Sequence, residues 1–219
     1  MNEKTAAIIG ATGLIGSHLL KLLQDDDHFS EISVLVRRPF PNNHPKIKVL
    51  VIDFADEAAF KAGIDGCDAV FVAVGTTQKK VKGDKEAYRK VDYGIPVNAA
   101  KFCAETGCKS FLLVSSVGAD SRSSNFYLNL KGEVEDEISR QSIPSISIFR
   151  PSMLLGNRQE SRPMETVAQV ISKGVSFLFP SKFKPIAAAN VAKAMVAASK
   201  LDNPGFRVYH FAEMILLLE

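Results

Sequence analysis

Three glycines mark the stretch Gly10-Ala11-Thr12-Gly13-Leu14-Ile15-Gly16, which lies between an apolar run and an amphipathic segment. This order predicts a strand, a tight turn and a helix. A helix N-terminus offers unpaired N–H groups and the positive end of the helix dipole, so it suits an anionic phosphate. Gly10 can make the turn, Gly13 admits a diphosphate close to the backbone, and Gly16 allows the helix to pack on the strand. We therefore interpret this turn as a dinucleotide site rather than as an ordinary glycine turn. The residues expected to hold the nucleotide here are Gly10, Thr12, Gly13, Leu14, Ile15 and Gly16.

Short apolar, β-branched runs alternate with longer amphipathic segments along the chain. The continuous apolar character of the short runs indicates strands covered on both faces, as in a parallel sheet between helices. The sequence therefore predicts a Rossmann-type α/β fold, a doubly wound, mostly parallel sheet with helices on both faces. The expected strands are Thr5–Ile9, Ile32–Val36, Ile47–Ile52, Ala69–Val74, Phe111–Ser115, Ser145–Phe149 and Arg207–Phe211. The expected helices are Leu14–Gln24, Glu57–Ala62, Asp84–Glu105, Phe126–Gln141, Met164–Lys173 and Asn190–Lys200.

No linker or internal repeat divides the sequence, so we expect a single domain over residues 1–219. The pattern is less regular after Pro151, and we interpret the residues from about 151 onward as a small C-terminal cap on the substrate side. Asn190 is expected to cap the N-terminus of the helix that follows it. The apolar tail Met214–Leu218 is expected to be a packed terminus or a subunit contact.

Composition argues against several classes of function. The net charge of +3 is small and dispersed, which argues against nucleic-acid binding. No apolar segment approaches the length of about eighteen residues that is typical of a membrane span. Cys67, Cys103 and Cys108 lack the spacing of a metal site, and such isolated cysteines are typical of a reducing compartment. The cysteine spacing leads us to expect no bound metal. No targeting segment is recognisable before the first strand, so we expect a cytosolic protein.

The end of the second predicted strand indicates which dinucleotide is bound. A site for NAD usually has an acidic residue there, which accepts a hydrogen bond from the ribose 2′-hydroxyl. This sequence has Arg37 and Arg38 instead, and two guanidinium groups suit the 2′-phosphate of NADP(H). A pair of solvated arginines at an exposed strand end is the alternative interpretation.

Further candidate nucleotide contacts follow the next two predicted strands. Asp53, at the end of the third strand, is a candidate partner for the adenine, and it could equally cap the helix that follows. Gly75 and Thr76, after the fourth strand, fall where a doubly wound sheet opens its ligand crevice. A glycine there can admit the ribose on the nicotinamide side, or it can make a simple exit turn.

Tyr127 and Lys131 are four residues apart on a predicted helix, so their side chains share one face. Reduction of a carbonyl by hydride needs a proton donor. A tyrosine beside an ammonium group can serve, because the positive charge favours the phenolate. A hydroxyl that binds the substrate oxygen is also needed, and Ser115 and Ser116 end the preceding strand. A surface pair on an amphipathic helix is the competing interpretation of Tyr127 and Lys131.

Together these features resemble the short-chain dehydrogenase/reductase superfamily in its atypical or extended branch. The glycine turn, the serine after a strand, the Tyr-x-x-x-Lys pair and Arg150-Pro151 occur in the order that the superfamily uses. Over nearly the whole chain the match is closer still to the Tat-interacting, oxidoreductase-like family. The matching segments are Gly75–Thr77, Val91–Tyr93, Ser115–Asn125, Lys131–Glu135, Phe149–Pro151 and Arg158–Pro163.

The resemblance implies binding of NADP(H) and assigns roles at the site. Ser116 would hold the substrate oxygen, Tyr127 would donate the proton, and Lys131 would clamp the cofactor. Ser115 is the alternative to Ser116, since either hydroxyl could face the crevice. Pro151 would lie against the nicotinamide carboxamide.

Two features depart from the superfamily pattern. Asp92 stands where many members carry a catalytic asparagine, and the region after the sixth strand is short for a deep substrate pocket. We expect an NADP(H)-dependent oxidoreductase acting on a small carbonyl compound or alcohol, with a possible second copy or protein partner. The alternative is an NADPH-binding sensor that acts through a partner protein. Arg158 and Arg162 are candidates for contact with an anionic substrate or the cofactor phosphate, or they belong to a solvated loop.

Overall fold

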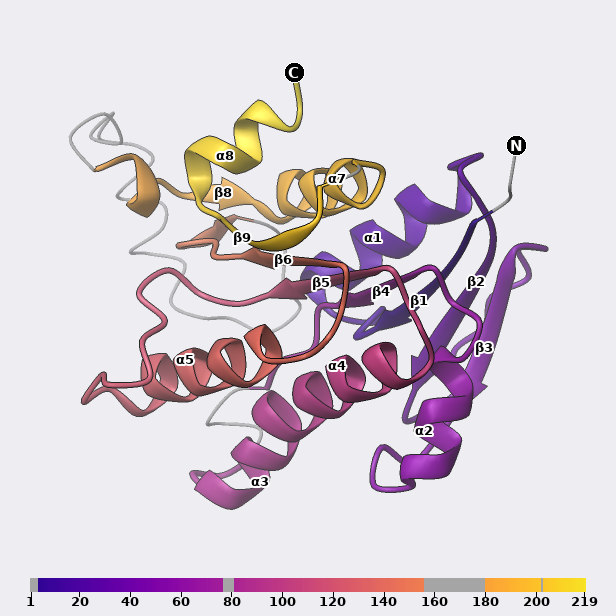
Figure 1. Ribbon diagram of the computed structural model, residues 1–219, viewed down its shortest axis with the longest axis horizontal. Helices are drawn as coiled ribbons and strands as arrows, with labels where there is room; N and C mark the ends of the chain where they lie inside the picture. The colour runs from indigo at the N-terminus through magenta and orange to yellow at the C-terminus, as the bar shows by residue number, and fades with distance from the viewer. Residues whose placement is uncertain (1–3, 77–80, 156–179, 202) are drawn as a thin grey trace.

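The computed structural model describes residues 4–76, 81–155, 180–201 and 203–219 (Figure 1). Seven strands form one sheet in the order β3-β2-β1-β4-β5-β6-β9, and each neighbouring pair is parallel. These strands are β1 (Lys4–Ile9), β2 (Phe29–Val36), β3 (Ile47–Val51), β4 (Ala69–Val72), β5 (Ser110–Val114), β6 (Ser145–Phe149) and β9 (Gly205–Tyr209). A separate short pair joins β7 (Leu154–Leu155) to β8 (Ile186–Ala187). The doubly wound α/β fold predicted from the sequence is confirmed.

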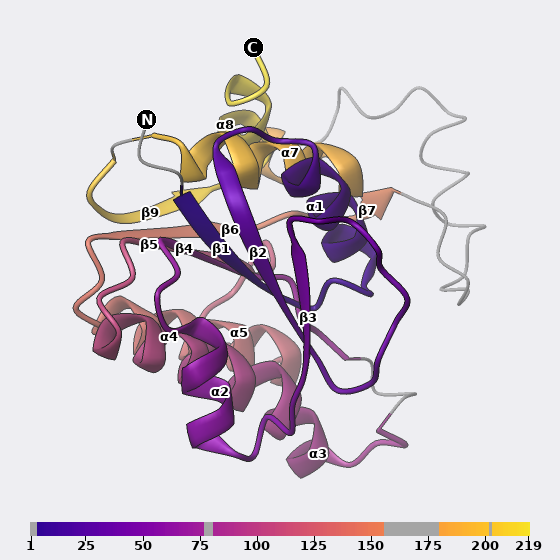
Figure 2. The ribbon, with the colours of Figure 1, turned by 90° about the vertical axis from the view of Figure 1, so that its right-hand side faces the viewer.

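Helices cover both faces of the large sheet (Figures 1 and 2). Helices α2, α4 and α5 lie on one face, and α1, α7 and α8 lie on the other. The helical elements are α1 (Leu14–Gln24), α2 (Glu57–Ile64), α3 (Lys85–Arg89), η1 (Lys90–Gly94), α4 (Ile95–Glu105), α5 (Phe126–Ser139), η3 (Ser181–Phe183), α7 (Ala188–Ser199) and α8 (Phe211–Leu216).

Alternate residues of the central strand β1 enter two different cores. Ala6 and Ile8 pack with the buried residues of α1 and α7, whereas Ala7 and Ile9 pack with those of α2, α4 and α5. This alternation follows from the pleat of a strand, which points successive side chains to opposite faces. Burial on both faces explains why Ala6–Ile9 of β1 and all of β4 are apolar at successive positions rather than at every second one.

The strand order reverses beside β1, with β2 and β3 on one side and β4 on the other. The connection after β1 passes through α1, and the connection after β4 leads to α3 and α4 on the opposite face (Figure 1). In open sheets of this kind, ligands bind at this reversal, beyond the carboxyl ends of the strands. The Gly10–Gly16 turn and the Gly75–Thr76 loop both lie there, as the sequence predicted.

The helical segment predicted at Asp84–Glu105 is confirmed in its limits, but it is not one regular α-helix. Its first turns form α3, whose N-terminus is capped by the Asp84 carboxylate, which accepts hydrogen bonds from the N–H groups of Glu86 and Ala87. The chain then passes through the π-helical turn η1 before α4 begins at Ile95. A π turn accommodates one extra residue and changes which side chains face the sheet. An apolar pattern read from the sequence does not distinguish this π turn from a regular α-helix.

The C-terminal third departs from the predicted boundaries in two places. Helix α7 begins at Ala188, with Ala187 rather than Asn190 at the N-cap and no side-chain cap. The start is fixed because β8 pairs with β7 and ends immediately before the helix. Strand β9 ends at Tyr209, and Phe211 opens α8, which the sequence interpretation missed. Met214 of α8 is buried, in agreement with a packed tail.

Much of the predicted cap, including the expected helix Met164–Lys173, lies outside the described residues. Arg158 and Arg162, the candidates for contact with an anionic substrate or the cofactor phosphate, also lie there, as does Thr77. In the described part of the chain, no helix has the length and apolar character needed to cross a membrane.

Candidate nucleotide and catalytic site

The glycine turn requires glycine at two positions for reasons of space. Gly10 has a φ of +94°, and a Cβ there would lie 2.7 Å from the carbonyl carbon and oxygen of Ala73, at the end of β4. A Cβ on Gly16 would lie 2.0 Å from the carbonyl oxygen of Gly10. The first turn of α1 is therefore in direct contact with the end of β1, as the spacing predicted.

The N-terminus of α1 is open to a ligand. Gly13 is the N-cap, no side chain caps the helix, and no acidic residue lies in its first turn. Thr12 and Gly13 are exposed, Leu14 is half-buried, and Ile15 lies in the core beneath them. No described side chain accepts a hydrogen bond from the backbone N–H groups of this first turn, which can therefore bind an anionic oxygen. This arrangement fits the diphosphate of a dinucleotide.

The candidate contacts for the adenosine half lie at the ends of β2 and β3. Arg37 and Arg38 are exposed, and neither forms an ion pair within the described part of the chain. Their guanidinium groups are therefore free to take up a phosphate. Asp53 is exposed and accepts a hydrogen bond from the N–H of Ala55 at 3.0 Å. The N-cap of α2 is Asp56, so the alternative interpretation of Asp53 as the cap of this helix is wrong.

The candidate proton donor lies in the first turn of α5. Asn125 begins this helix, because its side chain accepts hydrogen bonds from the N–H groups of Tyr127 and Leu128. Tyr127 is half-buried, and the ammonium of Lys131 lies 5.9 Å from the centre of its ring. The predicted proximity of the phenol and the ammonium is therefore present in the structure.

The two serines after β5 have different surroundings. The hydroxyl of Ser115 is buried and donates to the carboxylate of Glu135. Ser116 is half-buried, and its hydroxyl donates to the carbonyl of Val117 at 3.3 Å, a long bond that a substrate can replace. Of the two, Ser116 is the hydroxyl available to a ligand. Val117 also links Ser116 to Pro151, because its N–H donates to the Pro151 carbonyl at 3.0 Å.

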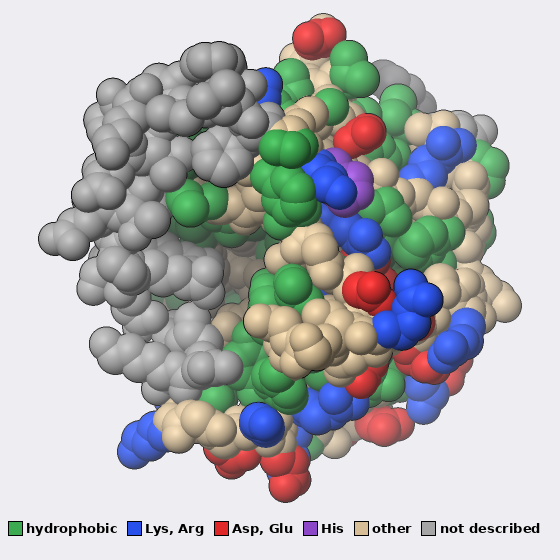
Figure 3. All heavy atoms as spheres, turned by 90° about the vertical axis from the view of Figure 1, so that its left-hand side faces the viewer, with side chains coloured by type: hydrophobic (Ala, Val, Ile, Leu, Met, Phe, Trp, Pro, Cys, Tyr) green, Lys and Arg blue, Asp and Glu red, His purple; other side chains and the backbone are tan. Residues whose placement is uncertain are grey.

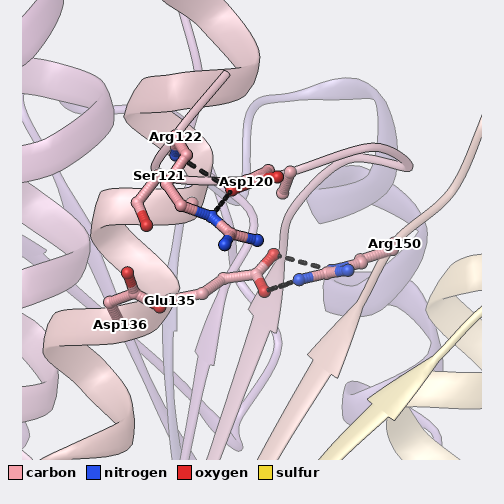
Figure 4. A pocket seen from close by; sticks show the side chains of 8 residues that line it. Asp120, Ser121, Arg122, Glu135, Asp136 and Arg150 are labelled. Carbon is pink, nitrogen blue, oxygen red and sulfur yellow. Dashed lines mark hydrogen bonds and ion pairs between the residues drawn. The ribbon is translucent and has the colours of Figure 1, made fainter.

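A buried network behind Ser115 was not predicted from the sequence. Nε of Arg150 lies 3.0 Å and 3.1 Å from the two carboxylate oxygens of Glu135, whose side chain is 4% exposed (Figure 4). This network ties the end of β5, the middle of α5 and the end of β6 together. Glu135 follows Lys131 by four residues on α5. This spacing places Glu135 on the same face of α5 as Tyr127 and Lys131, and it is the sequence feature from which the network could have been predicted.

A second unpredicted contact involves the lysine itself. Nζ of Lys131 lies 3.1 Å from Oδ1 of Asp92, and both side chains are almost fully buried. The other oxygen of Asp92 accepts a hydrogen bond from the N–H of Thr76 at 2.7 Å. Asp92, noted in the sequence only as a departure from a superfamily pattern, thus joins the loop after β4 to the candidate catalytic helix.

A cavity of about 440 Å³ lies beside the Glu135–Arg150 pair (Figure 4). Its wall does not include Ser116, Tyr127 or Lys131, so it is distinct from the candidate catalytic site. The hydrogen bond from the N–H of Arg122 holds the pKa of Asp120, on this wall, below its ordinary value. The residues that line the cavity are Ala119, Asp120, Ser121, Arg122, Gly132, Glu135, Asp136 and Arg150.

The charges at the molecular surface are mixed. On the face shown in Figure 3, the described acidic and basic side chains are interspersed and form no extended area of one sign. Among the described residues, no cluster of three or more histidine, cysteine, aspartate or glutamate side chains could hold a metal ion.

Comparison with known proteins identifies the family of this chain. Residues 10–202 match the family described as NAD(P)H-binding. The chain belongs to this NAD(P)H-binding family. Protein FMP52, mitochondrial, of Candida albicans is 36% identical over 197 residues, which cover 86% of this chain and 85% of that protein. Protein HTATIP2 of Rattus norvegicus is 33% identical over 208 residues, which cover 94% of this chain and 84% of that protein. The resemblance to the atypical short-chain dehydrogenase/reductase group is confirmed.

Solved structures show the fold of this family member independently. The Bordetella bronchiseptica enzyme WbmH in complex with NAD+ superimposes with a TM-score of 0.73 at 19% identity, covering 96% of this chain and 76% of the other. A UDP-N-acetylglucosamine 4-epimerase from Methanobrevibacter ruminantium gives a TM-score of 0.71 at 17% identity, covering 96% and 77%. Both likenesses confirm the Rossmann-type fold.

The predicted cytosolic location is wrong. The relatives from Candida albicans and Debaryomyces hansenii, at 36% and 35% identity, are both named as mitochondrial proteins. The prediction rested on the absence of a recognisable targeting segment, and such an absence carries no positive information about a compartment.

Proposed function

We propose that this NAD(P)H-binding protein is an NADP(H)-dependent oxidoreductase that reduces a small carbonyl compound or oxidises the corresponding alcohol. The observation that carries the proposal is the approach of Lys131 to Tyr127, with the Ser116 hydroxyl nearby in the chain and accessible. An inert nucleotide-binding fold has no need of a phenol beside a buried ammonium group. The nucleotide would lie on Gly10, Thr12, Gly13, Leu14, Ile15, Gly16, Gly75, Thr76 and Pro151, with Asp53 near the adenine.

The preference for NADP(H) rests on Arg37 and Arg38. Both guanidinium groups are exposed at the end of β2 and are not neutralised by a described carboxylate. A phosphate on the 2′-oxygen would form charge-assisted hydrogen bonds with them. The position that an NAD site usually gives to an acidic residue carries two positive charges here, so a free 2′-hydroxyl would find no acceptor.

Each side chain at the catalytic site has a definite task in this proposal. When bound, NADPH supplies a hydride to the carbonyl carbon. The Ser116 hydroxyl donates a hydrogen bond to the carbonyl oxygen and holds it. Tyr127 gives its proton to that oxygen, so the product is an alcohol, and the positive charge of Lys131 stabilises the phenolate left behind. Tyr127 is half-buried and can recover a proton from water.

Two measurements test the proposal. NADPH is expected to bind at least about tenfold more tightly than NADH, the value of one charge-assisted hydrogen bond. Arg37→Ala and Arg38→Ala should each narrow that ratio. Lys48→Ala, which removes an exposed positive charge from β3, is the matched control and should leave the ratio unchanged. Equal affinities of the wild type for the two nucleotides would refute the phosphate argument.

Catalysis is tested with a panel of aldehydes and ketones, following the oxidation of NADPH. Tyr127→Phe is expected to lower kcat by about 10²-fold or more while the Kd for NADPH changes less than about twofold. Turnover that survives this substitution would remove Tyr127 from the mechanism.

A second candidate function is favoured by a specific observation: Lys131 is already paired with the buried carboxylate of Asp92. An ammonium engaged in this way can serve to report nucleotide binding rather than to assist chemistry. In that case the protein is an NADPH-binding sensor that acts through a partner. Tight NADPH binding with no turnover across the carbonyl panel would favour the sensor over the enzyme.

A further inference from the structure

Asp92 lies in the π-helical turn η1 and is buried inside the protein. Tyr88 and Asp92 are four residues apart, and both are buried, although α3 and η1 otherwise carry several charged side chains. Asp92 is 1% exposed, which is rare for a carboxylate that lacks a partner of opposite charge. Its partner is Lys131 of α5, itself 4% exposed.

Both oxygens of Asp92 are engaged, and they contact different elements. Oδ1 lies 3.1 Å from Nζ of Lys131, and Oδ2 accepts the N–H of Thr76 at 2.7 Å. The hydroxyl of Tyr88 donates to the carbonyl of the same Thr76 at 3.4 Å. The peptide groups on both sides of Thr76 are thus held from the α3–η1 segment. One carboxylate therefore fixes the loop after β4 relative to the lysine on α5.

A buried ion pair of this kind is weak evidence for a purely stabilising role. Removing two charges from water is costly, and apolar residues of similar size often stabilise a core equally well. A single partner left behind is far worse, because its charge is buried and unpaired. The contacts of Asp92 with Lys131 and Thr76, both at the proposed nucleotide site, indicate that the pair serves position rather than stability.

We propose that Asp92 is a positioning residue of the nucleotide site, which sets where the Lys131 ammonium stands relative to the Thr76 loop. The inference rests on the proposed function of this site in nucleotide binding. Asp92 uses one donor of the ammonium and leaves the other donors for hydroxyl groups of the ligand. It also keeps the Thr76 backbone at the mouth of the crevice beside Gly75.

A double-mutant cycle on nucleotide affinity tests this role. The variants are Asp92→Asn, Lys131→Met and the two combined, and the probe is NADPH titrated by its fluorescence. Asp92→Asn and Lys131→Met are each expected to weaken binding about tenfold, the loss of one charge-assisted hydrogen bond. The double variant should bind about as weakly as Lys131→Met alone, because Asp92 acts through the lysine. Losses that multiply in the double variant would overturn the proposal.

A fragment of the cofactor separates positioning from general damage. Adenosine 2′,5′-bisphosphate carries only the half expected near Arg37 and Arg38, so its affinity should be unchanged in Asp92→Asn. An equal loss of affinity for the fragment and for NADPH would mean that Asp92 only supports the fold, which refutes the positioning role. Glu86→Gln is the matched control, since it removes a carboxylate from an exposed ion pair between Glu86 of α3 and Lys90 of η1. It should change neither affinity.

Stability measurements keep the test decisive if Asp92→Asn folds poorly. The double variant has no unpaired buried charge, so it should unfold at a higher temperature than Asp92→Asn. A double variant that folds no better than Asp92→Asn would refute the buried pairing itself. A wild-type protein that binds no nicotinamide nucleotide would refute the proposed function, and this role with it. If the wild type binds NADPH and the losses of affinity multiply in the double variant, the positioning role of Asp92 is refuted but the proposed function is not.

Discussion

Replacement of Gly16 by alanine should destabilise this protein, although the same change stabilises most helices. In an ordinary helix interior, alanine is favoured over glycine by about 1 kcal/mol. Here the added Cβ would lie 2.0 Å from the carbonyl oxygen of Gly10 and 2.9 Å from Cα of Ala11. Both are backbone atoms, so no side-chain rotation relieves the overlap. Helix α1 must move away from β1 by roughly 1.5 Å to restore an ordinary contact of about 3.5 Å.

The expected loss follows from that displacement. Overpacking of a core by one methyl group typically costs about 1–3 kcal/mol, and a backbone clash belongs at the upper end of this range. A domain of this size loses about 2–4 °C in Tm per kcal/mol, so Gly16→Ala should lower Tm by about 6–12 °C. The displaced helix N-terminus should also weaken NADPH binding.

The assay is thermal unfolding followed by circular dichroism, with Gly94→Ala as the matched control. Gly94 has helical dihedral angles, and the nearest atom to its added Cβ is the Arg89 carbonyl oxygen, at 3.9 Å. This control should gain about 0.5–1 kcal/mol and unfold at a slightly higher temperature. If Gly16→Ala unfolds at or above the wild-type temperature, the close contact between α1 and the end of β1 is not real.

Three further predictions concern other parts of the structure. Ser116→Ala should abolish turnover with little change in Tm. Ser115→Ala should instead lower the free energy of unfolding by about 1.5–3 kcal/mol, because the Glu135 carboxylate loses a hydrogen-bond donor. If Ser115→Ala lost turnover and Ser116→Ala lost stability, the roles assigned to the two serines would have to be exchanged. Burial raises the pKa of the Cys67 thiol to about 12, and all three cysteines are buried, so a thiol reagent at mildly alkaline pH should label none until denaturant is added; rapid labelling of native protein would contradict this. Partial burial alone would raise the pKa of Asp68, but the hydrogen bond from the Thr5 N–H and the ion pairs with lysines lower it below the ordinary value. Its stabilising contribution is therefore present above the ordinary carboxyl pKa and is lost as the pH falls through the lowered value, so Asp68→Asn should lower Tm at neutral pH and by less in acid; an equal loss at both would exclude the charge as the cause.

The sequence predicted the elements whose boundaries are set by local chemistry. Helix Leu14–Gln24 and strand Ser145–Phe149 have the predicted limits, because Gly13 precedes the helix, three aspartates follow it, and Pro144 and Pro151 flank the strand. The order of strands and helices then follows from their alternation. The turn at Gly10 and the pair Tyr127–Lys131 were found for the same reason, since the residues in each are close in the sequence.

Contacts between distant segments could not be read in this way. Asp92 and Lys131 lie on different helical elements, about forty residues apart in the sequence, and a local pattern does not show that they meet. The buried contacts of Glu135 with Ser115 and Arg150 join three separate elements. A carboxylate on an amphipathic helix is usually solvated, so sequence alone favours the surface for it.

The packing of α1 against α7 joins segments that are far apart in the sequence, so α1 is synthesised well before the helix that covers it. Leu19 and Leu23 of α1 are fully buried in a core that includes Val191 and Met195 of α7. Helix α7 is synthesised about 170 residues after α1, and translation adds about 5–20 residues per second. The apolar face of α1 therefore lacks its packing partner α7 for on the order of ten to thirty seconds during synthesis. During that interval the nascent chain exposes apolar side chains beside the Gly10–Gly16 turn. We therefore expect chaperones to bind the amino-terminal part of the chain.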